Sequence, residues 1–147
     1  MIWRPAPSAG LAPGVVDEPV GHVDIAPTIL AAAGLETPQW MQGTVLPKRA
    51  GEQARERVMT EWIDSFDGND ITMQSMVRDG YIVTAYEPTN RYQGTEGELY
   101  CIKDDPHQWH NLWDDAGHRK LREELVADMK EHLPAGREQP REKIAPV

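Results

Sequence analysis

The stretch TMQSMVRDGYIVTAYE, residues 72–87, limits the possible folds of this chain more than any other. Two runs rich in β-forming residues meet at Asp79-Gly80, a dipeptide that tolerates the positive φ angles of a type I′ turn. The stretch therefore predicts a β-hairpin. Alternating runs before it, at 57–63, and after it, at 97–103, predict further half-buried strands. We expect a small antiparallel β-sheet of three to four strands.

A helix near the C-terminal end is predicted to cover this sheet. In HRKLREELVADMKEHL, residues 118–133, apolar side chains recur at every fourth position and form one stripe. An amphipathic helix of about four turns buries such a stripe against another element, so the fold class of this part is α+β. The stripe consists of Leu121, Leu125, Met129 and Leu133, with Val126 beside it.

The first 50 residues follow a different pattern. Ile2 and Trp3 are typical of the end of a strand, and the Pro- and Gly-rich segment 4–14 predicts an irregular connection. The change of period near residue 50 predicts a boundary within the chain. The predicted parts are 1–50, then 51–133 with the sheet and its helix, and a charged, disordered tail at 134–147.

A short helix is predicted within HVDIAPTILAAAGL, residues 22–35. Asp24 is a suitable N-cap, Pro27 fits the first turn, and Gly34 is a typical residue just after a helix end. One face of this helix is apolar and the helix carries few charges, so it must lie against something large. That face consists of Ile25, Ile29 and Ala33, with Leu30 beside them.

The charge balance excludes several classes of partner. The chain has 24 acidic and 15 basic residues and a formal net charge of −9. Such a field disfavours nucleic acid and anionic membrane surfaces, so we expect neither as a partner. No apolar run approaches the ~20 residues that a membrane span needs, and the N-terminus lacks the pattern of a secretion signal. The sequence leaves the compartment open.

The polar stretch ELYCIKDDPHQWHNLWDD, residues 98–115, could form a metal site. On a helical turn His107, His110 and Asp114 would point to one side, and two imidazoles with a carboxylate suit Zn²⁺. A fourth ligand at convincing spacing is missing. The metal site is therefore the weaker interpretation of this stretch.

The simpler interpretation of the same stretch is structural. A helical turn would also make Trp109, Leu112 and Trp113 an apolar anchor, and its opposite side would then be polar without any further role. Cys101, the single cysteine, cannot form an internal disulfide. It lies within a predicted strand, and the acidic residues nearby would reduce the reactivity of its thiol.

Several phrases of the sequence together resemble the C-terminal part of a sulfatase, a formylglycine-dependent sulfuric ester hydrolase of the alkaline phosphatase superfamily. Residues 2–35 resemble the passage from a core strand through a Pro/Gly loop into a helix that begins Asp-x-x-Pro-Thr. MQGTVLP, at 41–47, resembles the loop that follows. Residues 76–87 resemble the hairpin of the small C-terminal sheet, and 97–115 the closing strand and turn.

This resemblance implies an activity for the complete enzyme. Such enzymes hydrolyse the sulfate ester of a small substrate with a formylglycine, made from a Cys/Ser-x-Pro-x-Arg motif, and with Ca²⁺ held by Asp and Asn. In the family these groups precede the segment seen here. Cys101 is followed by Ile-Lys-Asp-Asp and is not that nucleophile, and Gln108 stands where Glu is frequent. We expect no catalytic residue, metal ligand or cofactor in this chain, and no activity from it alone.

The resemblance also implies a partner, the missing N-terminal catalytic domain. Residues 1–50 would then be an edge strand, a loop and a helix of the large α/β domain. The small sheet of these enzymes flanks their substrate pocket, which makes some residues candidates for the substrate rim, although packing is the simpler interpretation of each. These candidates are His22, Trp62, Tyr86 and Tyr92.

A second hypothesis assigns the chain to a different class, the non-catalytic interaction modules. The apolar face of the helix at 24–33 would be exposed if no large domain covered it. An exposed apolar face of this kind can associate with a partner or with a second copy of the chain. Self-association is therefore the alternative to a catalytic partner.

Overall fold

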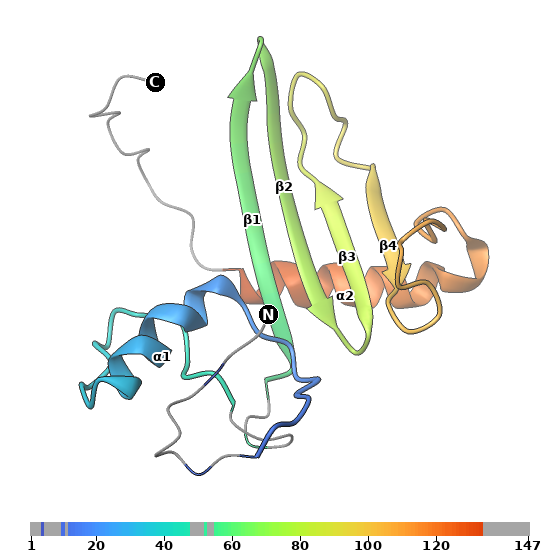
Figure 1. The fold of residues 1–147 in the computed structure, drawn as a ribbon. Helices are drawn as coiled ribbons and strands as arrows, with labels where there is room; N and C mark the ends of the chain where they lie inside the picture. Colours follow the sequence, from blue (N-terminus) through green and yellow to red (C-terminus); the bar gives the residue numbers. More distant parts are fainter. Residues whose placement is uncertain (1–3, 5–9, 11, 48–51, 53–54, 134–147) are drawn as a thin grey trace. The chain divides into compact units, whose positions relative to one another are not determined.

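The computed structural model describes residues 4, 10, 12–47, 52 and 55–133. The chain divides into two compact units: the first contains α1 (Ile25–Ala32), and the second contains α2 (Arg119–His132) with most of a four-stranded sheet (Figure 1). The predicted strand at residues 2–3 and the charged tail at 134–147 lie outside the described residues. In the part that is described, no helix has the length and apolar character that crossing a membrane requires.

The strands of the sheet follow the order of the chain and run antiparallel (Figure 1). The two central strands, β2 and β3, pair with the edge strands β1 and β4. Between β3 and β4 the register places Val83 opposite Leu99. The predicted antiparallel sheet and the α+β class are confirmed. The strands are β1 (Arg57–Phe66), β2 (Asn69–Arg78), β3 (Tyr81–Tyr86) and β4 (Gly97–Cys101).

Two Asp-Gly turns connect the first three strands. Asp79-Gly80 joins β2 to β3 with φ angles of 52° and 78°, so the predicted hairpin is confirmed. Asp67-Gly68 joins β1 to β2 with φ angles of 51° and 73°. The sequence prediction missed this second turn, because the residues around it are polar and do not continue the alternating pattern. β1 and β2 consequently extend further than predicted.

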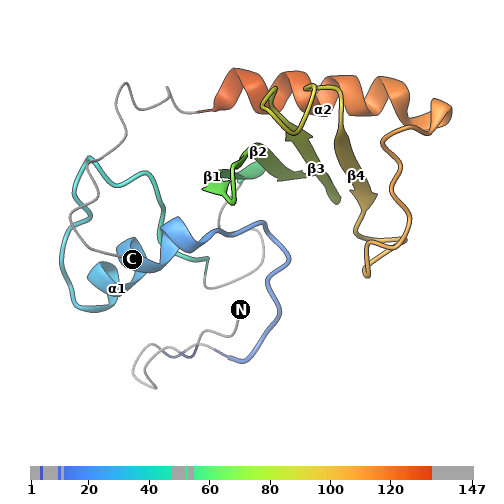
Figure 2. The same ribbon diagram turned by 90° about the horizontal axis from the view of Figure 1, so that it is seen from above.

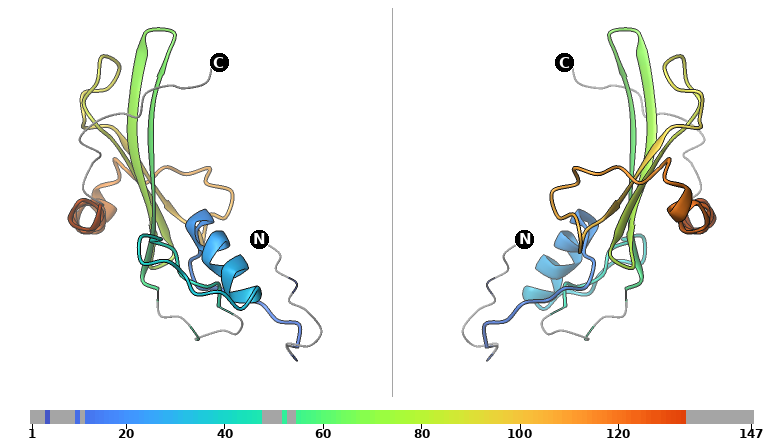
Figure 3. Two further views of the ribbon diagram at one scale, coloured as in Figure 1. Left: turned by 90° about the vertical axis from the view of Figure 1, so that its left-hand side faces the viewer. Right: turned by 90° about the vertical axis from the view of Figure 1, so that its right-hand side faces the viewer.

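Helix α2 lies across one face of the sheet and closes the core of the second unit (Figures 2 and 3). A short 3-10 turn, η3 (Ala116–His118), precedes it. Leu125 and Met129 of the predicted stripe are almost completely buried, and burial of side chains of this size contributes ~1.5–3 kcal/mol each. The core consists of Met76, Val83, Ala85, Leu99, Trp113, Leu125 and Met129.

Helix α1 follows the 3-10 turn η2 (His22–Asp24) and ends in a Schellman motif. The Leu35 N–H donates to the Leu30 carbonyl at 2.9 Å, and the Gly34 N–H donates to the Ala31 carbonyl at 3.1 Å. Gly34 has a φ of 72°, which glycine adopts without strain. The predicted glycine end of this helix is confirmed.

The helical turn predicted at 107–114 is wrong. The chain forms an irregular loop there, and Gln108 has a positive φ of 56°. The physical reason is Asn111, whose Oδ1 accepts hydrogen bonds from the Leu99 N–H at 3.0 Å and from the Trp113 N–H at 2.9 Å. A side-chain amide that bonds to the backbone in this way replaces the helical pattern and ties the loop to β4.

Candidate functional site

The sheet has a face opposite α2, called the open face below. Side chains alternate along a strand, and Val83 of β3 packs into the core, so Thr84 and Tyr86 belong to the open face. Thr84 donates a hydrogen bond to Ser75 Oγ of β2 at 3.0 Å. Trp62 of β1 belongs to the open face as well, three positions after Met59, which packs against the core.

Two of the candidate rim residues are in direct contact. The rings of Tyr86 and Tyr92 stack with their centroids 4.4 Å apart and their planes 23° from parallel. The Tyr86 hydroxyl donates to Glu98 Oε1 at 3.2 Å. Burial of the phenol and the charge of Glu98 raise the pKa of Tyr86 to about 12. Tyr86 therefore stays neutral at physiological pH and serves as a hydrogen-bond donor.

The loop 87–96 between β3 and β4 fixes Tyr92 through its own hydrogen bonds. The Thr89 N–H donates to the Tyr92 carbonyl at 2.9 Å, and the Tyr92 N–H donates to Thr89 Oγ1 at 3.2 Å. Asn90 ties the loop to the first hairpin: its Nδ2 donates to the Gly68 carbonyl at 2.7 Å, and its Oδ1 accepts from the Asp70 N–H at 2.9 Å. The sequence predicted only a polar loop here.

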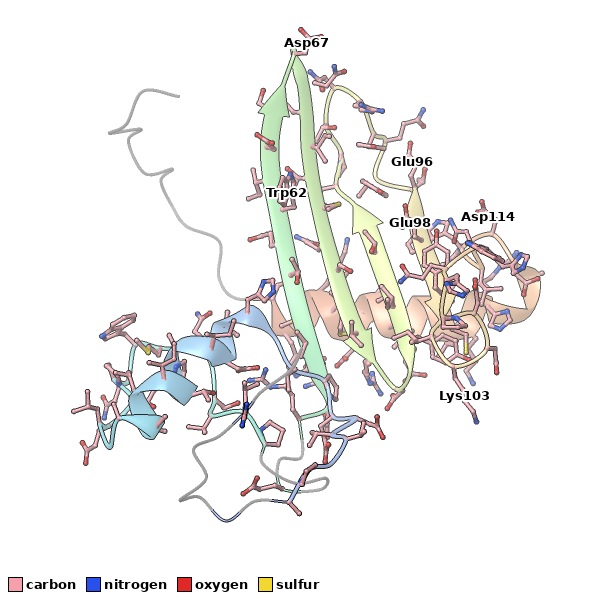
Figure 4. All side chains as sticks on the ribbon, viewed as in Figure 1. Trp62, Asp67, Glu96, Glu98, Lys103 and Asp114 are labelled. Atoms are coloured by element: carbon pink, nitrogen blue, oxygen red, sulfur yellow. The ribbon has the colours of Figure 1, made fainter. Side chains whose placement is uncertain are left out.

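The other two rim candidates are not part of this stack. Trp62 is 53% exposed on β1 (Figure 4), and β2 lies between β1 and β3, the strand that carries Tyr86. His22 is exposed at the start of η2, in the first unit. The structure thus brings together Tyr86 and Tyr92, and the rim role of all four residues stays a prediction.

The geometry gives no support to the metal site. Among the residues that the structure describes, no three His, Cys, Asp or Glu side chains gather so as to hold a metal ion, and this includes His107, His110 and Asp114. His107 instead stacks on Trp109, with the ring centroids 5.0 Å apart. The Asp105 carboxylate accepts the His110 N–H at 2.8 Å, and this bond holds the pKa of Asp105 below its ordinary value. These polar groups shape the loop.

Cys101 has a structural role as well. Its Sγ donates to Asp104 Oδ2 at 3.3 Å. The nearby Tyr81 hydroxyl has a raised pKa, first because of burial and then because of Cys101.

The described residues do not fit formylglycine or Ca²⁺, the groups that the resemblance implies for complete enzymes. No step of sulfate-ester hydrolysis is assigned to them.

Trp113 anchors the loop after β4, whereas Trp109 does not. Trp113 is buried and its Nε1 donates to the Thr95 carbonyl at 3.0 Å. A Cβ atom at Gly97 would come within 2.4 Å of the Trp113 ring, so only glycine fits there without a shift. Leu112 packs against the core as predicted, but Trp109 is 77% exposed. The anchor role predicted for Trp109 is wrong, because the helical turn that would have directed it inward is absent.

Asp24 forms the centre of a buried polar cluster in the first unit. Its carboxylate accepts hydrogen bonds from the Gly21 N–H at 2.8 Å and the Thr44 N–H at 2.9 Å. Both terminal nitrogens of Arg55 donate to it, at 2.5 Å and 2.8 Å. Arg55 also donates to Thr44 Oγ1 at 2.9 Å. We call Asp24, Thr44 and Arg55 the Asp24 clamp, and the sequence prediction missed it.

The Asp24 clamp has two consequences for the first unit. Burial alone would raise the pKa of Asp24, but the hydrogen bonds from Gly21, Thr44 and Arg55 outweigh it and hold this pKa below its ordinary value. Asp24 is the N-cap residue of α1, as predicted, but it has helical backbone angles and its side chain makes no capping hydrogen bond to α1. Its carboxylate is occupied by the clamp and by the first turn of η2.

The apolar face of α1 is exposed, as the sequence suggested for a helix that needs a large covering surface. The buried residues of α1 are Pro27 and Thr28. Thr28 Oγ1 donates to the Asp24 carbonyl at 2.6 Å and accepts from the Leu46 N–H at 2.8 Å. By contrast, Ile29 is 57% exposed. The other exposed apolar side chains of this unit include Val23, Ile25, Leu35 and Trp40.

Solved structures define the class of fold to which this chain belongs. A putative sulfatase from Bacteroides thetaiotaomicron VPI-5482 matches with a TM-score of 0.62 and 24% identity, over 74% of this chain and 23% of that one. BT1596, a 2-O GAG sulfatase, gives a TM-score of 0.62 at 23% identity, over 74% and 23% of the two chains. BT4656 in complex with its substrate D-glucosamine-2-N,6-O-disulfate gives 0.60 at 23% identity, over 74% and 22%. The fold is that of a segment of sulfatases.

Sequence comparisons identify the family. The uncharacterized sulfatase YidJ of Escherichia coli (strain K12) is 33% identical over 116 residues, in an alignment that covers 75% of this chain and 21% of YidJ. The family model described as N-sulphoglucosamine sulphohydrolase, C-terminal, matches residues 7–135. The chain belongs to this family, and its resemblance to the C-terminal part of a sulfatase is confirmed. It spans about a fifth of the length of the relatives that it matches.

Proposed function

We propose that this chain acts as the C-terminal part of a sulfatase that hydrolyses the sulfate ester of a small substrate, and that it is inactive by itself. The observation that carries the proposal is the family match over residues 7–135. Two further observations support the inactivity of the isolated chain. The sequence contains no Cys/Ser-x-Pro-x-Arg motif, and the described residues offer no cluster of three metal-binding side chains.

In the complete enzyme, the catalytic part would supply the formylglycine nucleophile and Ca²⁺, whose chemistry is nucleophilic attack on sulfur and stabilisation of charge on the sulfate oxygens. This chain would supply a helix that packs on the catalytic part and a sheet that borders the substrate. The exposed face of α1, with Ile25 and Ile29, supports the first role. The stacked Tyr86 and Tyr92 support the second.

The test is coexpression of this chain with the catalytic part of a sulfatase from the same genome, chosen because it contains a Cys/Ser-x-Pro-x-Arg motif. We expect the two polypeptides to copurify, and we expect the pair to hydrolyse an aryl sulfate. Turnover of the aryl sulfate by this chain alone, above a buffer blank, would contradict the predicted inactivity. Failure of the two polypeptides to associate would contradict the sulfatase role.

The alternative is a non-catalytic interaction module, and the same exposed apolar residues of the first unit favour it. In that case the face of α1 binds a second copy of this chain or another protein without any catalytic part. Light scattering of the purified chain separates the two functions. A dimer or larger assembly without an added partner supports the module, whereas a well-behaved monomer counts against self-association.

A further inference from the structure

The loop 87–96 presents a guanidinium group that has no carboxylate partner. Arg91 is exposed, and its Cζ lies over the Tyr92 ring, 5.6 Å from the ring centroid. Among the residues that the structure describes, no Asp or Glu forms an ion pair with Arg91.

The carboxylates closest to Arg91 in the sequence are all engaged by other groups. Glu96 accepts hydrogen bonds from the backbone N–H groups of residues 93–95, at 3.0 to 3.1 Å. Glu98 accepts the Tyr86 hydroxyl, and Glu87 forms an ion pair with Lys130 at 3.5 Å. The loop and its two flanking strands thus satisfy their own anions and leave the Arg91 cation available for an external one.

The position of Arg91 is defined by its surroundings. Its backbone N–H donates to Thr89 Oγ1 at 3.2 Å, and its guanidinium lies over a Tyr92 ring that is itself stacked on Tyr86. A cation over an aromatic face gains ~0.5–1 kcal/mol at an exposed site. This contact restricts the guanidinium, so a ligand that binds it has less conformational entropy to remove.

We propose that the substrate is a sulfated sugar and that Arg91 binds one of its sulfates, other than the ester that is hydrolysed. For the identity of this ligand the inference rests on the proposed sulfatase function. The planar guanidinium offers parallel N–H donors that match two oxygens of a sulfate. The Tyr92 ring already has two partners, so Tyr92 acts as a positioning residue for Arg91 and does not provide a stacking surface for the sugar.

The test is an NMR titration of the isotope-labelled chain with three probes: a disulfated amino-sugar disaccharide, its unsulfated counterpart and inorganic sulfate. We expect the disulfated sugar to shift the signals of the Arg91 side chain and the Tyr92 ring, and the unsulfated sugar to leave them unchanged. Arg91→Gln should weaken binding of the disulfated sugar by about tenfold or more, the size of a lost charge-assisted hydrogen bond. Arg119→Gln removes the same charge from the exposed start of α2 and should leave binding unchanged.

Two variants of Tyr92 separate positioning from folding. Tyr92→Phe keeps the ring and should retain both the affinity and the preference for the sulfated sugar. Tyr92→Leu should reduce that preference by about threefold to tenfold while the circular dichroism spectrum stays the same. A merely structural role would predict a change in the spectrum without a change in sulfate preference.

Three outcomes would overturn the inference. They are equal affinity of the Arg91→Gln variant and the unchanged chain, an equal response to the unsulfated sugar, and no shift of the Arg91 signals with the disulfated sugar. Inorganic sulfate should shift the same signals, because the proposed contact is made to a sulfate group, and the absence of such a shift would also overturn the inference. The titration uses this chain alone and measures no hydrolysis, so its failure is distinguishable from failure of the coexpression test.

Discussion

The two units of this chain are stabilised in opposite ways. The second unit buries apolar side chains between the sheet and α2, and Met76, Leu99 and Met129 are completely inaccessible to solvent. The first unit buries the carboxylate of Asp24 with the Arg55 guanidinium and leaves Ile29 exposed. In the second unit the buried apolar surface stabilises the fold, whereas in the first unit the apolar surface of α1 remains exposed to solvent.

This difference contrasts a part whose apolar side chains are buried within the chain with a part whose apolar side chains are exposed. Burial of apolar surface is the main favourable contribution to folding, whereas a buried ion pair adds little net stability because both charges lose their hydration. A polar clamp fixes geometry instead. The first unit therefore has a defined conformation, but it lacks the contribution that would be gained by covering α1.

The largest expected effect is in the core of the second unit. Leu99→Ala should lower the free energy of unfolding by about 2–5 kcal/mol, because it removes buried methyl groups and leaves a cavity under α2. Urea denaturation followed by circular dichroism measures this change. Leu35→Ala, at the exposed end of α1, is the matched control and should change stability by less than ~0.5 kcal/mol. Equal effects of the two substitutions would remove the difference between the units.

The next effect is local to the first unit. Arg55→Met removes the cation from a buried carboxylate. We expect this change to lower the free energy of opening of α1 by about 2 kcal/mol. Amide hydrogen exchange should show loss of protection in α1, while the amides of α2 keep theirs. Arg119→Met, at an exposed position, should alter neither helix. Equal loss of protection in both helices would show that the two units unfold together.

The structural features behind these predictions differ in how easily they could be predicted from the sequence. Asp79-Gly80 and the four-residue spacing along α2 were visible because both are local, with every residue of the signal adjacent or one turn away. The Asp24 clamp was not visible, because Arg55 lies 31 residues further along the chain. The phrases around Asp24 and Thr44 marked the right segments, but only their packing shows that one guanidinium joins them.

The candidate site shows the same limit. Tyr86 was selected from its type and strand, and it lies on the open face that alternation predicts. The role of Arg91 could not be predicted, because it depends on which acidic neighbours are already engaged by the backbone or by other side chains. The misassignment of Trp109 has a similar cause, since one side-chain amide, that of Asn111, decides between a helical turn and a loop.

A smaller effect is expected from acid. The pKa of Asp24 is held below its ordinary value of 3.8, so the stability gained from its ionised form is fully present above that pH. This contribution is lost as the pH falls through the lowered pKa. Hydrogen exchange of α1 should therefore stay constant from neutral pH to near 3.8 and accelerate below it, beyond the intrinsic change of exchange with pH. The same profile in an Asp24→Asn variant would contradict the assignment to Asp24.

The smallest expected effect is also the most informative about the first unit. Ile29→Gln should change the stability of the isolated chain by less than ~0.5 kcal/mol, because the side chain is already 57% exposed. In the coexpressed pair, the same substitution places an amide in a buried apolar contact and should weaken association by about tenfold. Ala31→Gln, on another side of α1, is the matched control and should leave association unchanged. If Ile29→Gln instead destabilised the isolated chain as much as Leu99→Ala, the face of α1 would already be covered within this chain, and the two units would be stabilised alike.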